Sequence, residues 1–304
     1  MPIPDVARVG AFLEEVASEH MLPFWRRLAP GDVTSKATVA DPGDVVTTVD
    51  LAVERRLTEG LRALLPGSAM VGEEAAHADP RVLDALGGDG WIWLVDPLDG
   101  TRNFVEGNDR FGIMVTLVRA ARARAAWIHL PARGQTFFAE QGAGAFLNGA
   151  RLRADPAASA EELAGTIYAR YMPSEVRATV EARARGRLPV TSDAGDASNA
   201  GSACVDYTSV ARGEKDFYVY YRVLPWDHAP GSLILREVNG VVEHLDGTSY
   251  AVTSESRVTI VARTRDIAER VRRVLCAGGD GHGDGSCPSE GEGLPGVSVL
   301  EQKR

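Results

Sequence analysis

Cysteine is scarce in this chain, which has only Cys204, Cys276 and Cys287 among its 304 residues. Three scattered cysteines cannot form a disulfide framework, and their spacing does not fit a zinc site. The six histidines show no metal-ligand spacing either. The sequence therefore argues against a disulfide-stapled fold and against a zinc centre.

Long apolar runs and excess positive charge are also missing. No run approaches the length that crosses a membrane, and the acids Asp5, Glu14 and Glu15 stand where a signal peptide would be basic and then apolar. The net charge of −9 argues against a nucleic-acid polymer as a general partner. We therefore expect a cytoplasmic globular protein with no membrane segment.

Hydrophobic periodicity divides the chain into two parts of different character. The first part predicts helical structure and then an antiparallel sheet. The helical spacing runs over 6–28, with an interruption near Pro23, and over 49–65; strands are expected over 69–71, 91–95, 113–118, 125–130 and 135–139, and a hairpin turn at Asn148 and Gly149. The second part alternates strands over 166–168, 189–191, 217–221, 241–243 and 258–262 with helices over 173–185, 203–212, 227–238 and 265–275. Such alternation is typical of an α/β domain.

These patterns predict an N-terminal α+β domain over 1–153 and a C-terminal α/β domain over 154–276. The last segment, 277–304, is Gly-rich, polar and aperiodic. Such a segment cannot bury enough apolar surface to offset the entropy of ordering it. We therefore expect a disordered tail.

The most informative segment is an apolar run that ends in acids. The run from Trp91 to Val95 predicts a buried strand, and Asp96 and Asp99 follow it on either side of Pro97. At the end of a strand this turn can aim both carboxylates at one pocket, and oxygen clusters of this kind suit Mg²⁺. The alternative is an ordinary turn in which Asp96 caps and Asp99 is solvated.

A glycine, a threonine and a third aspartate extend this pattern. The backbone N–H groups of Gly100 and Thr101 could hold phosphate oxygens, and the Thr101 hydroxyl could orient a water. Asp227 lies within the segment from Trp226 to Gly231, at the expected start of a helix. There it could cap the helix with one oxygen and face a metal with the other. Metal and phosphate groups at one point suggest phosphoryl chemistry.

The two segments resemble the signatures of the inositol monophosphatase family of metal-dependent, lithium-sensitive sugar and nucleotide phosphatases. Asp96 to Phe104 matches Asp-Pro-x-Asp-Gly-Thr-x-Asn-Phe, and Trp226 to Gly231 matches Trp-Asp-x-Ala-x-Gly. Two weaker features, at 44–50 and 72–74, stand in the family's order. Four ordered blocks make chance a poor explanation.

The resemblance implies a fold and an activity. The fold would be a layered α-β-α-β-α sandwich of the sugar phosphatase type, with an antiparallel sheet in the N-terminal half and the active site between the halves. The activity would be that of a Mg²⁺-dependent phosphomonoesterase with two or three ions, in which metal-activated water attacks a small phosphorylated metabolite and lithium inhibits. A homodimer is left open.

Other activities fit the same motifs. Nucleotide 3′-phosphatase, histidinol-phosphatase and fructose-1,6-bisphosphatase activities are alternatives on the same site. A non-catalytic relative that binds metal or phosphorylated metabolites is the alternative from another class.

The resemblance also implies the roles of individual residues. The expected metal ligands are Glu73, Asp96, the Leu98 carbonyl, Asp99 and Asp227. Glu73 and Thr101 would orient the attacking water, and Asp50 resembles the carboxylate that hydrogen-bonds this threonine. Asp50 could equally be the N-cap of its helix. The expected phosphate and substrate contacts are Gly100, Thr101, Gly201, Ser202, Ala203 and Tyr220.

Four nearby residues leave the substrate and the charge of the site open. Tyr220 stands where inositol-type members carry a glutamate that binds a substrate hydroxyl, so inositol phosphate itself is in doubt. With Arg222 facing the pocket, a substrate that carries an aromatic or second anionic group would fit better than inositol phosphate. In the alternative, Tyr220 points into the core and Arg222 points to solvent. Lys36 could supply positive charge to the site or be a solvated lysine. Glu74 is expected to be a solvated loop acid.

Overall fold

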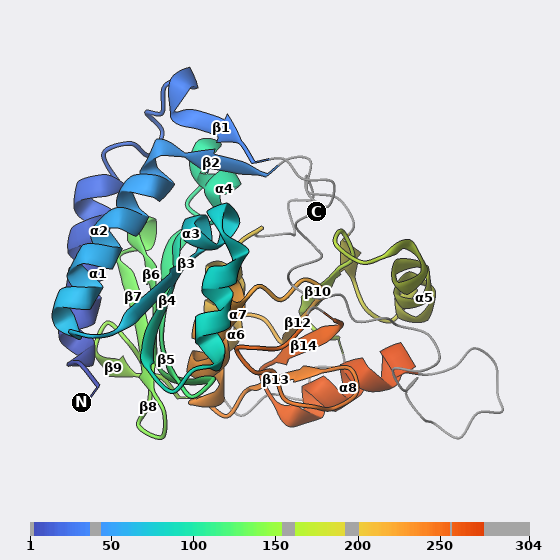
Figure 1. Cartoon of the computed structure of the whole chain (residues 1–304). Helices are drawn as coiled ribbons and strands as arrows, with labels where there is room; N and C mark the ends of the chain where they lie inside the picture. Colours follow the sequence, from blue (N-terminus) through green and yellow to red (C-terminus); the bar gives the residue numbers. More distant parts are fainter. Residues whose placement is uncertain (1–2, 37–43, 154–161, 192–200, 256, 277–304) are drawn as a thin grey trace.

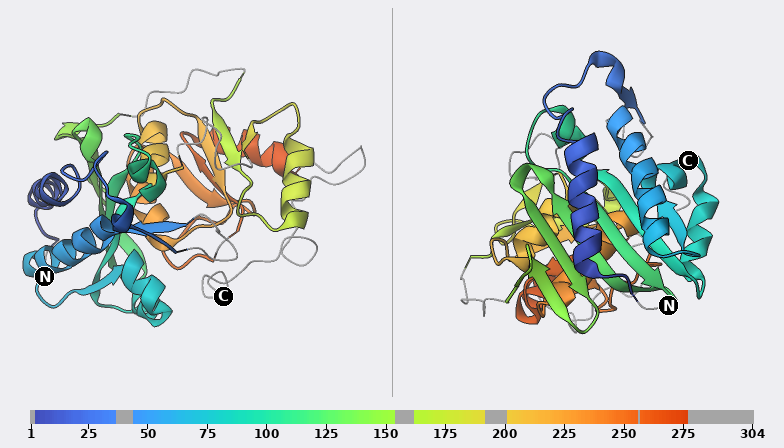
Figure 2. Two further views of the ribbon diagram at one scale, coloured as in Figure 1. Left: turned by 90° about the horizontal axis from the view of Figure 1, so that it is seen from above. Right: turned by 90° about the vertical axis from the view of Figure 1, so that its left-hand side faces the viewer.

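Helices and sheets alternate in five layers in the computed structural model, which describes residues 3–36, 44–153, 162–191, 201–255 and 257–276 (Figure 1). The view from above in Figure 2 shows the N-terminal helices at one side and the C-terminal helix at the other. This order confirms the expected α-β-α-β-α sandwich. The expected tail over 277–304 lies outside the described residues. No helix within the described ranges is long and apolar enough to cross a membrane.

The first two layers are a pair of helices and a large sheet. Helices α1 (Val6–His20) and α2 (Thr48–Leu64) pack on one face of the sheet. Its seven strands follow in spatial order β3 (Ala69–Gly72), β4 (Trp91–Asp99), β5 (Gly112–Arg119), β6 (Arg122–Leu130), β7 (Gln135–Glu140), β8 (Gly144–Leu147) and β9 (Ala150–Arg151). Strands β3 and β4 are parallel and the other neighbours are antiparallel. Asn148 and Gly149 both have positive φ and join β8 to β9, as predicted.

The middle layer consists of α6 (Ala203–Ala211) and α7 (Pro225–Arg236), which are buried between the two sheets. The second sheet has the strand order β11 (Val190–Thr191), β10 (Gly165–Tyr168), β12 (Phe217–Tyr220), β14 (Thr259–Ala262) and β13 (Val241–His244). Strand β10 is parallel to both its neighbours, and the other pairs are antiparallel. Tyr207 of α6 and Ile234 of α7 share one core cluster with Phe137 and Val261 of the two sheets. The middle helices therefore bind the two sheets to each other.

The last layer covers the outer face of the second sheet. It consists of α5 (Ser174–Ala184) and α8 (Arg265–Cys276), which pack on each other through an apolar cluster that includes Val176, Val180, Ile267 and Val271. Since α6 and α7 contact both sheets, the division into 1–153 and 154–276 stays a prediction.

Short elements complete the described part of the chain. They are the hairpin β1 (Val33–Ser35) and β2 (Val45–Thr47), the helices α3 (Glu73–Ala78) and α4 (Thr101–Val105), and the 3₁₀ turns Pro30–Asp32, Pro80–Gly87 and Pro131–Arg133. The helical spacing over 6–28 is interrupted near Pro23, as predicted: α1 ends at His20 and a turn follows over 21–26. The predicted start of α7 is two residues late, because Pro225 occupies the first helical position, where a missing N–H costs nothing.

Candidate active site

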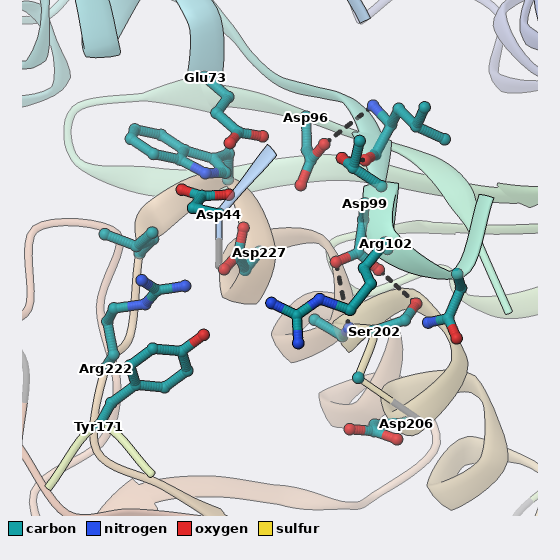
Figure 3. Close-up of a pocket in the computed structure, with 18 of the residues that line it drawn as sticks. Asp44, Glu73, Asp96, Asp99, Arg102, Tyr171, Ser202, Asp206, Arg222 and Asp227 are labelled. Carbon is teal, nitrogen blue, oxygen red and sulfur yellow. Dashed lines mark hydrogen bonds between the residues drawn. The ribbon is translucent and has the colours of Figure 1, made fainter. Parts of the chain in front are cut away.

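A cavity of about 270 Å³ lies where the end of β4 meets the first turns of α6 and α7 (Figure 3). It gathers most of the residues that the sequence singled out: Glu73, Asp96, Leu98, Asp99, Gly100, Thr101, Gly201, Ser202, Ala203, Tyr220 and Asp227 all line it. Asp50 is absent from the lining and contacts Thr101, as described below. Segments far apart in the sequence therefore meet at one point.

A local irregularity of β4 aims its two acids. Asp96 pairs with Met114 and Asp99 with Gly112 on β5, so β4 has one residue more than its partner over this stretch. Such a bulge bends the strand and redirects its side chains. The N–H of Leu98 donates to Asp96 Oδ1 at 3.0 Å. The turn then closes at Gly100, whose φ is +82°, and a Cβ at this position would lie 2.5 Å from the Arg110 carbonyl oxygen.

Asp99 is held by the start of α6. It accepts hydrogen bonds from Ser202 Oγ at 2.6 Å and from the backbone N–H groups of Ala203 at 3.2 Å and Cys204 at 2.8 Å. The first N–H groups of a helix have no partner within it, so a carboxylate from another element can satisfy them. Ser202 and Ala203 thus tie the middle layer to β4 while they also line the cavity.

Asp227 reaches the same point from α7. It is the third residue of this helix, after Pro225 and Trp226, and the residue that precedes the helix is Leu224. The expectation that Asp227 caps α7 is therefore wrong, because Pro225 starts the helix earlier. Further along, Gly231 lies against the Tyr207 ring, and a Cβ there would lie 2.0 Å from it. This glycine lets α6 and α7 approach closely.

Three carboxylates meet in this pocket. Asp96, Asp99 and Asp227 each offer an oxygen, and these oxygens lie within 4.8 Å of one another. Burial raises the pKa of Asp96 well above its usual range, and the charges of Glu73, Asp99 and Asp227 raise it further. Burial and the charges of Asp99 and Glu73 likewise raise the pKa of Asp227. A cluster of acids that repel one another is stabilised by a bound cation.

The donor set suits a hard divalent cation. Every candidate ligand is an oxygen, and Mg²⁺ prefers carboxylate, carbonyl and water oxygens. Figure 3 shows the Glu73, Asp96, Asp99 and Asp227 side chains on one side of the pocket. The cluster Asp96, Asp99 and Asp227 could therefore hold a metal ion, with Glu73 beside it.

Thr101 connects the cavity to Asp50. Its hydroxyl lies 3.1 Å from Asp50 Oδ1 and 2.9 Å from the Leu98 carbonyl oxygen. The N-cap of α2 is Thr47, whose own N–H donates to Asp50 Oδ2 at 2.8 Å, so Asp50 is the partner in a capping box. Burial raises the pKa of Asp50 to about 6. The contact with Thr101 that the resemblance implied is thus present, and Asp50 is not the N-cap.

A buried lysine neutralises part of the acidic wall. Lys36 is only 8% exposed and forms ion pairs with Glu73, at 3.2 Å, and with Glu74. Burial acts to lower the pKa of Lys36, but the charges of Glu73 and Glu74 raise it overall. The expectation that Glu74 is solvated is wrong, because its side chain is 9% exposed. Burial raises the pKa of Glu74 to about 7.

Glu54 is a supporting residue that the sequence did not reveal. Its carboxylate accepts hydrogen bonds from the N–H groups of Glu74 at 2.9 Å and Ala75 at 3.0 Å. It thereby holds the start of α3, and so Glu73, against α2. The signal available in the sequence was only its place on the partly buried face of α2.

The far side of the pocket is aromatic and cationic. Tyr171 and Arg222 both line it, and the Arg222 guanidinium carbon lies 3.9 Å from the centre of the Tyr171 ring. Figure 3 shows Arg102 reaching into the pocket from the β4 side. Tyr220 also lines the pocket, and its hydroxyl donates to Asp206 Oδ2 at 2.6 Å. Asp206 was missed from the sequence, although it lies four residues after Ser202 and so on the same face of α6.

The fold is a layered α-β-α-β-α sandwich, and its buried carboxylate cluster, which could hold a metal ion, lies at the carboxyl end of the interior strand β4. The inositol monophosphatase family matches residues 6–278. The chain belongs to this family.

Characterised relatives bear two kinds of name. A fructose-1,6-bisphosphatase/inositol-1-monophosphatase of Thermotoga maritima is 32% identical over 206 residues, which cover 67% of this chain and 73% of the relative. The Nus factor SuhB of Escherichia coli K12 is 32% identical over 221 residues, which cover 72% and 79%.

Solved structures match over most of the chain. The Thermotoga maritima inositol monophosphatase superposes with a TM-score of 0.71 at 28% identity, over 89% of this chain and 96% of the other. A staphylococcal inositol monophosphatase-1, solved as an inhibitory complex soaked in LiCl, gives 0.73 at 20% identity, over 90% and 94%. At that identity the second match shows the fold alone.

Proposed function

We propose that this protein is a Mg²⁺-dependent phosphomonoesterase that hydrolyses a small phosphorylated metabolite. The observation that carries the proposal is the buried cluster of Asp96, Asp99 and Asp227, whose oxygens lie within 4.8 Å of one another beside the Gly100–Thr101 turn. Family membership supports the same chemistry, since the family is generally Mg²⁺-dependent.

Each part of the site has a role in this proposal. Glu73, Asp96, the Leu98 carbonyl, Asp99 and Asp227 hold two or three Mg²⁺ ions. Bound Mg²⁺ supplies a water of lowered pKa and neutralises charge on the phosphoryl group. The N–H groups of Gly100 and Thr101 orient the phosphate, with Gly201, Ser202 and Ala203 lining its approach.

Asp50 and Thr101 orient the attacking water. The Thr101 hydroxyl has a single proton and lies within reach of Asp50 Oδ1 and the Leu98 carbonyl oxygen. Because it donates to one of these, its lone pairs are left to accept from a water. Thr101 thus fixes the direction of the attacking water together with Glu73, and Asp50 fixes Thr101.

The substrate carries an aromatic or second anionic group next to its phosphate ester. The support is the pairing of Arg222 with Tyr171 at the wall opposite the acids. A guanidinium on an aromatic ring is pre-organised to bind a carboxylate, a second phosphate or a planar group. Histidinol phosphate, fructose 1,6-bisphosphate and adenosine 3′,5′-bisphosphate have these features, whereas inositol 1-phosphate does not.

Turnover of p-nitrophenyl phosphate with and without Mg²⁺ tests the proposed activity. The proposal predicts phosphate release that requires Mg²⁺ and stops when EDTA is added. Release that is equal with Mg²⁺ and with EDTA would contradict it.

A non-catalytic role is the alternative, because several relatives are named Nus factor SuhB. A protein that had lost catalysis would be free to lose its acids. All of the expected carboxylates are present here and four of them line the cavity, which favours the enzyme. If Mg²⁺ raised the melting temperature but no phosphate ester were hydrolysed, the non-catalytic role would be the better account.

A further inference from the structure

A buried histidine joins the helix that carries Asp227 to the wall of the pocket. His228 follows Asp227 on α7 and is only 2% exposed. Each of its ring nitrogens has a hydrogen-bond partner. Nδ1 lies 2.9 Å from the Tyr207 hydroxyl, and Nε2 lies 3.2 Å from the Arg222 carbonyl oxygen. No step of the proposed reaction uses this ring.

The two partners determine where the ring carries its proton. A carbonyl oxygen only accepts hydrogen bonds, so Nε2 of His228 must donate to Arg222. Nδ1 of the neutral ring then accepts, and the Tyr207 hydroxyl donates to it. The rings of Tyr207 and Tyr220 pack at steep angles to the imidazole, with centroids at 5.7 and 4.8 Å, and hold it in this orientation. Both nitrogens are therefore used within the protein, and His228 acts on its neighbours rather than on a ligand.

The neighbour that reaches the pocket is Arg222. It lies in the short segment between β12 and α7, which is neither helix nor strand. Its guanidinium carbon lies 3.9 Å from the centre of the Tyr171 ring, and both residues line the cavity. Figure 3 shows this guanidinium directed toward the side of the pocket where Asp227 lies. The hydrogen bond from His228 thus ties the backbone of Arg222 to the first turn of α7.

One helical turn therefore carries both a proposed metal ligand and the brace of a pocket arginine. Asp227 helps to set where the reacting phosphate binds, and His228, the next residue, sets where the backbone of Arg222 lies. The distance between the reacting phosphate and a second anion on the substrate is thus built into α7. Donors that are held in place before binding lose less freedom when they bind an anion.

We infer that His228 is a positioning residue for substrate selectivity, whose Nε2–H holds the backbone of Arg222 so that the guanidinium is in place for a second anionic group. The inference rests on the proposed phosphatase activity and adds the residue that orients its anion-binding arginine. The alternative is that His228 only fills the core between α6 and β12. Its loss would then affect every substrate alike.

Matched pairs of substrates read the second anion directly. The pairs are adenosine 3′,5′-bisphosphate with adenosine 3′-phosphate, and fructose 1,6-bisphosphate with fructose 1-phosphate. Each pair differs by one phosphate group, and we define the second-anion ratio as kcat/KM for the bisphosphate divided by that for the monophosphate, with Mg²⁺. In the wild type this ratio should be about tenfold or more in at least one pair, as expected for charge-assisted hydrogen bonds, and Arg222→Gln should bring it to about one. Ratios of about one in both pairs of the wild type would overturn the inference.

Two amide substitutions separate positioning from packing. An asparagine amide reaches the position of Nδ1, whereas a glutamine amide reaches that of Nε2. His228→Asn should therefore lower the second-anion ratio about tenfold, mainly through a higher KM for the bisphosphate, and His228→Gln, which can still donate to Arg222, should keep most of it. Tyr207→Phe is the control, because it removes the partner of Nδ1 and leaves the bond to Arg222, so its ratio should equal that of the wild type. An unchanged ratio in His228→Asn, or an equal fall in Tyr207→Phe, would overturn the inference.

Two further measurements keep the test sharp. In the Arg222→Gln background, His228→Asn should leave the ratio unchanged, because no guanidinium remains to be positioned, and a further tenfold fall would overturn the inference. If His228→Asn does not fold, His228→Phe keeps a ring, removes the same bond and carries the same prediction. NMR of the wild type labelled with ¹⁵N-histidine, with the His228 signals identified by their absence in His228→Gln, should show a proton on Nε2 and none on Nδ1. A proton on Nδ1 alone would overturn the inference.

Failure of the proposed activity can be told apart from failure of the positioning role. If the wild-type protein hydrolyses no ester, phosphatase activity is wrong, and calorimetric titration of the same intact esters then gives the second-anion ratio from their Kd values. Tighter binding of a bisphosphate, lost in His228→Asn and kept in His228→Gln, would support the positioning role. Equal binding of both members of each pair by the wild type would overturn it.

Discussion

Replacing Asp96 by asparagine should separate metal chemistry from folding. Asn keeps the size of the side chain and an oxygen that can accept from the Leu98 N–H, now at 3.0 Å from Asp96 Oδ1. It removes one charge from a cluster whose oxygens lie within 4.8 Å. Two unit charges at that distance repel by roughly 3 kcal/mol at an effective dielectric constant of about 20.

The expected result follows from this repulsion. Part of it is already relieved in the metal-free protein, because burial and neighbouring charges raise the pKa of Asp96. The metal-free Asp96→Asn variant should therefore melt at the same temperature as the wild type or above it. Its phosphate release with Mg²⁺ should fall by at least about 100-fold, since metal stabilisation of the transition state contributes several kcal/mol.

The assay combines thermal melting with phosphate release across a range of Mg²⁺ concentrations. Asp84→Asn is the matched control, because Asp84 is an exposed acid outside the pocket, and this variant should behave as the wild type in both measurements. Near-normal activity in a folded Asp96→Asn protein would refute the assignment of Asp96 as a metal ligand. A large drop in its metal-free melting temperature would refute the argument from charge repulsion.

Three further predictions concern the metal site and its support. Mg²⁺ should bind more tightly at pH 8 than at pH 5.5, and its binding should release protons. The reason is that burial raises the pKa values of Asp96 and Asp227, which must lose their protons to bind the metal. Calorimetry in buffers of different ionisation enthalpy measures the protons released. Because these pKa values are raised in the folded state, the protonated Asp96 and Asp227 stabilise the metal-free protein in acid, and this contribution is lost as the pH rises. The gain in melting temperature from Mg²⁺ should therefore also grow with pH. A gain independent of pH would count against the cluster. Millimolar LiCl should inhibit phosphate release at fixed Mg²⁺ more than NaCl does, and equal responses to the two salts would argue against the family mechanism. Gly231→Ala should lower the free energy of unfolding by about 1–3 kcal/mol in urea titrations, because the new methyl group meets the Tyr207 ring, and an unchanged midpoint would show that α6 and α7 can move apart.

The sequence predicted much of the fold because its local signals agree with its tertiary structure. The apolar residues Val53, Leu57, Leu61 and Leu64 recur with helical spacing, and in α2 the first three are fully buried and Leu64 is half-buried. The Asn148–Gly149 turn joins two strands as its chemistry requires. The errors occur where tertiary context decides. Pro225 starts α7 earlier than the apolar pattern does, and α1 ends at His20, three residues before the interruption that Pro23 predicts.

The proposed metal ligands were visible in the sequence because two short motifs contain most of them. Their supports were not, because those contacts join distant segments. Asp99 meets Ser202 across 103 positions and Lys36 meets Glu73 across 37. No local pattern marks Glu54 or Asp206 as members of the site, since each is one polar residue on a helix. Only the packing of α6 places Asp206 at the pocket, and only the packing of α2 places Glu54 against the start of α3.

Phosphate release from a panel of metabolites, with Mg²⁺ and with EDTA, tests the central claim most directly. The panel is inositol 1-phosphate, histidinol phosphate, fructose 1,6-bisphosphate and adenosine 3′,5′-bisphosphate. We predict release that requires Mg²⁺, with higher kcat/KM for at least one substrate that has an aromatic or second anionic group than for inositol 1-phosphate. A clear preference for inositol 1-phosphate would contradict the assigned role of Arg222 and Tyr171. No release from any substrate, by a folded protein that binds Mg²⁺, would contradict the phosphatase itself.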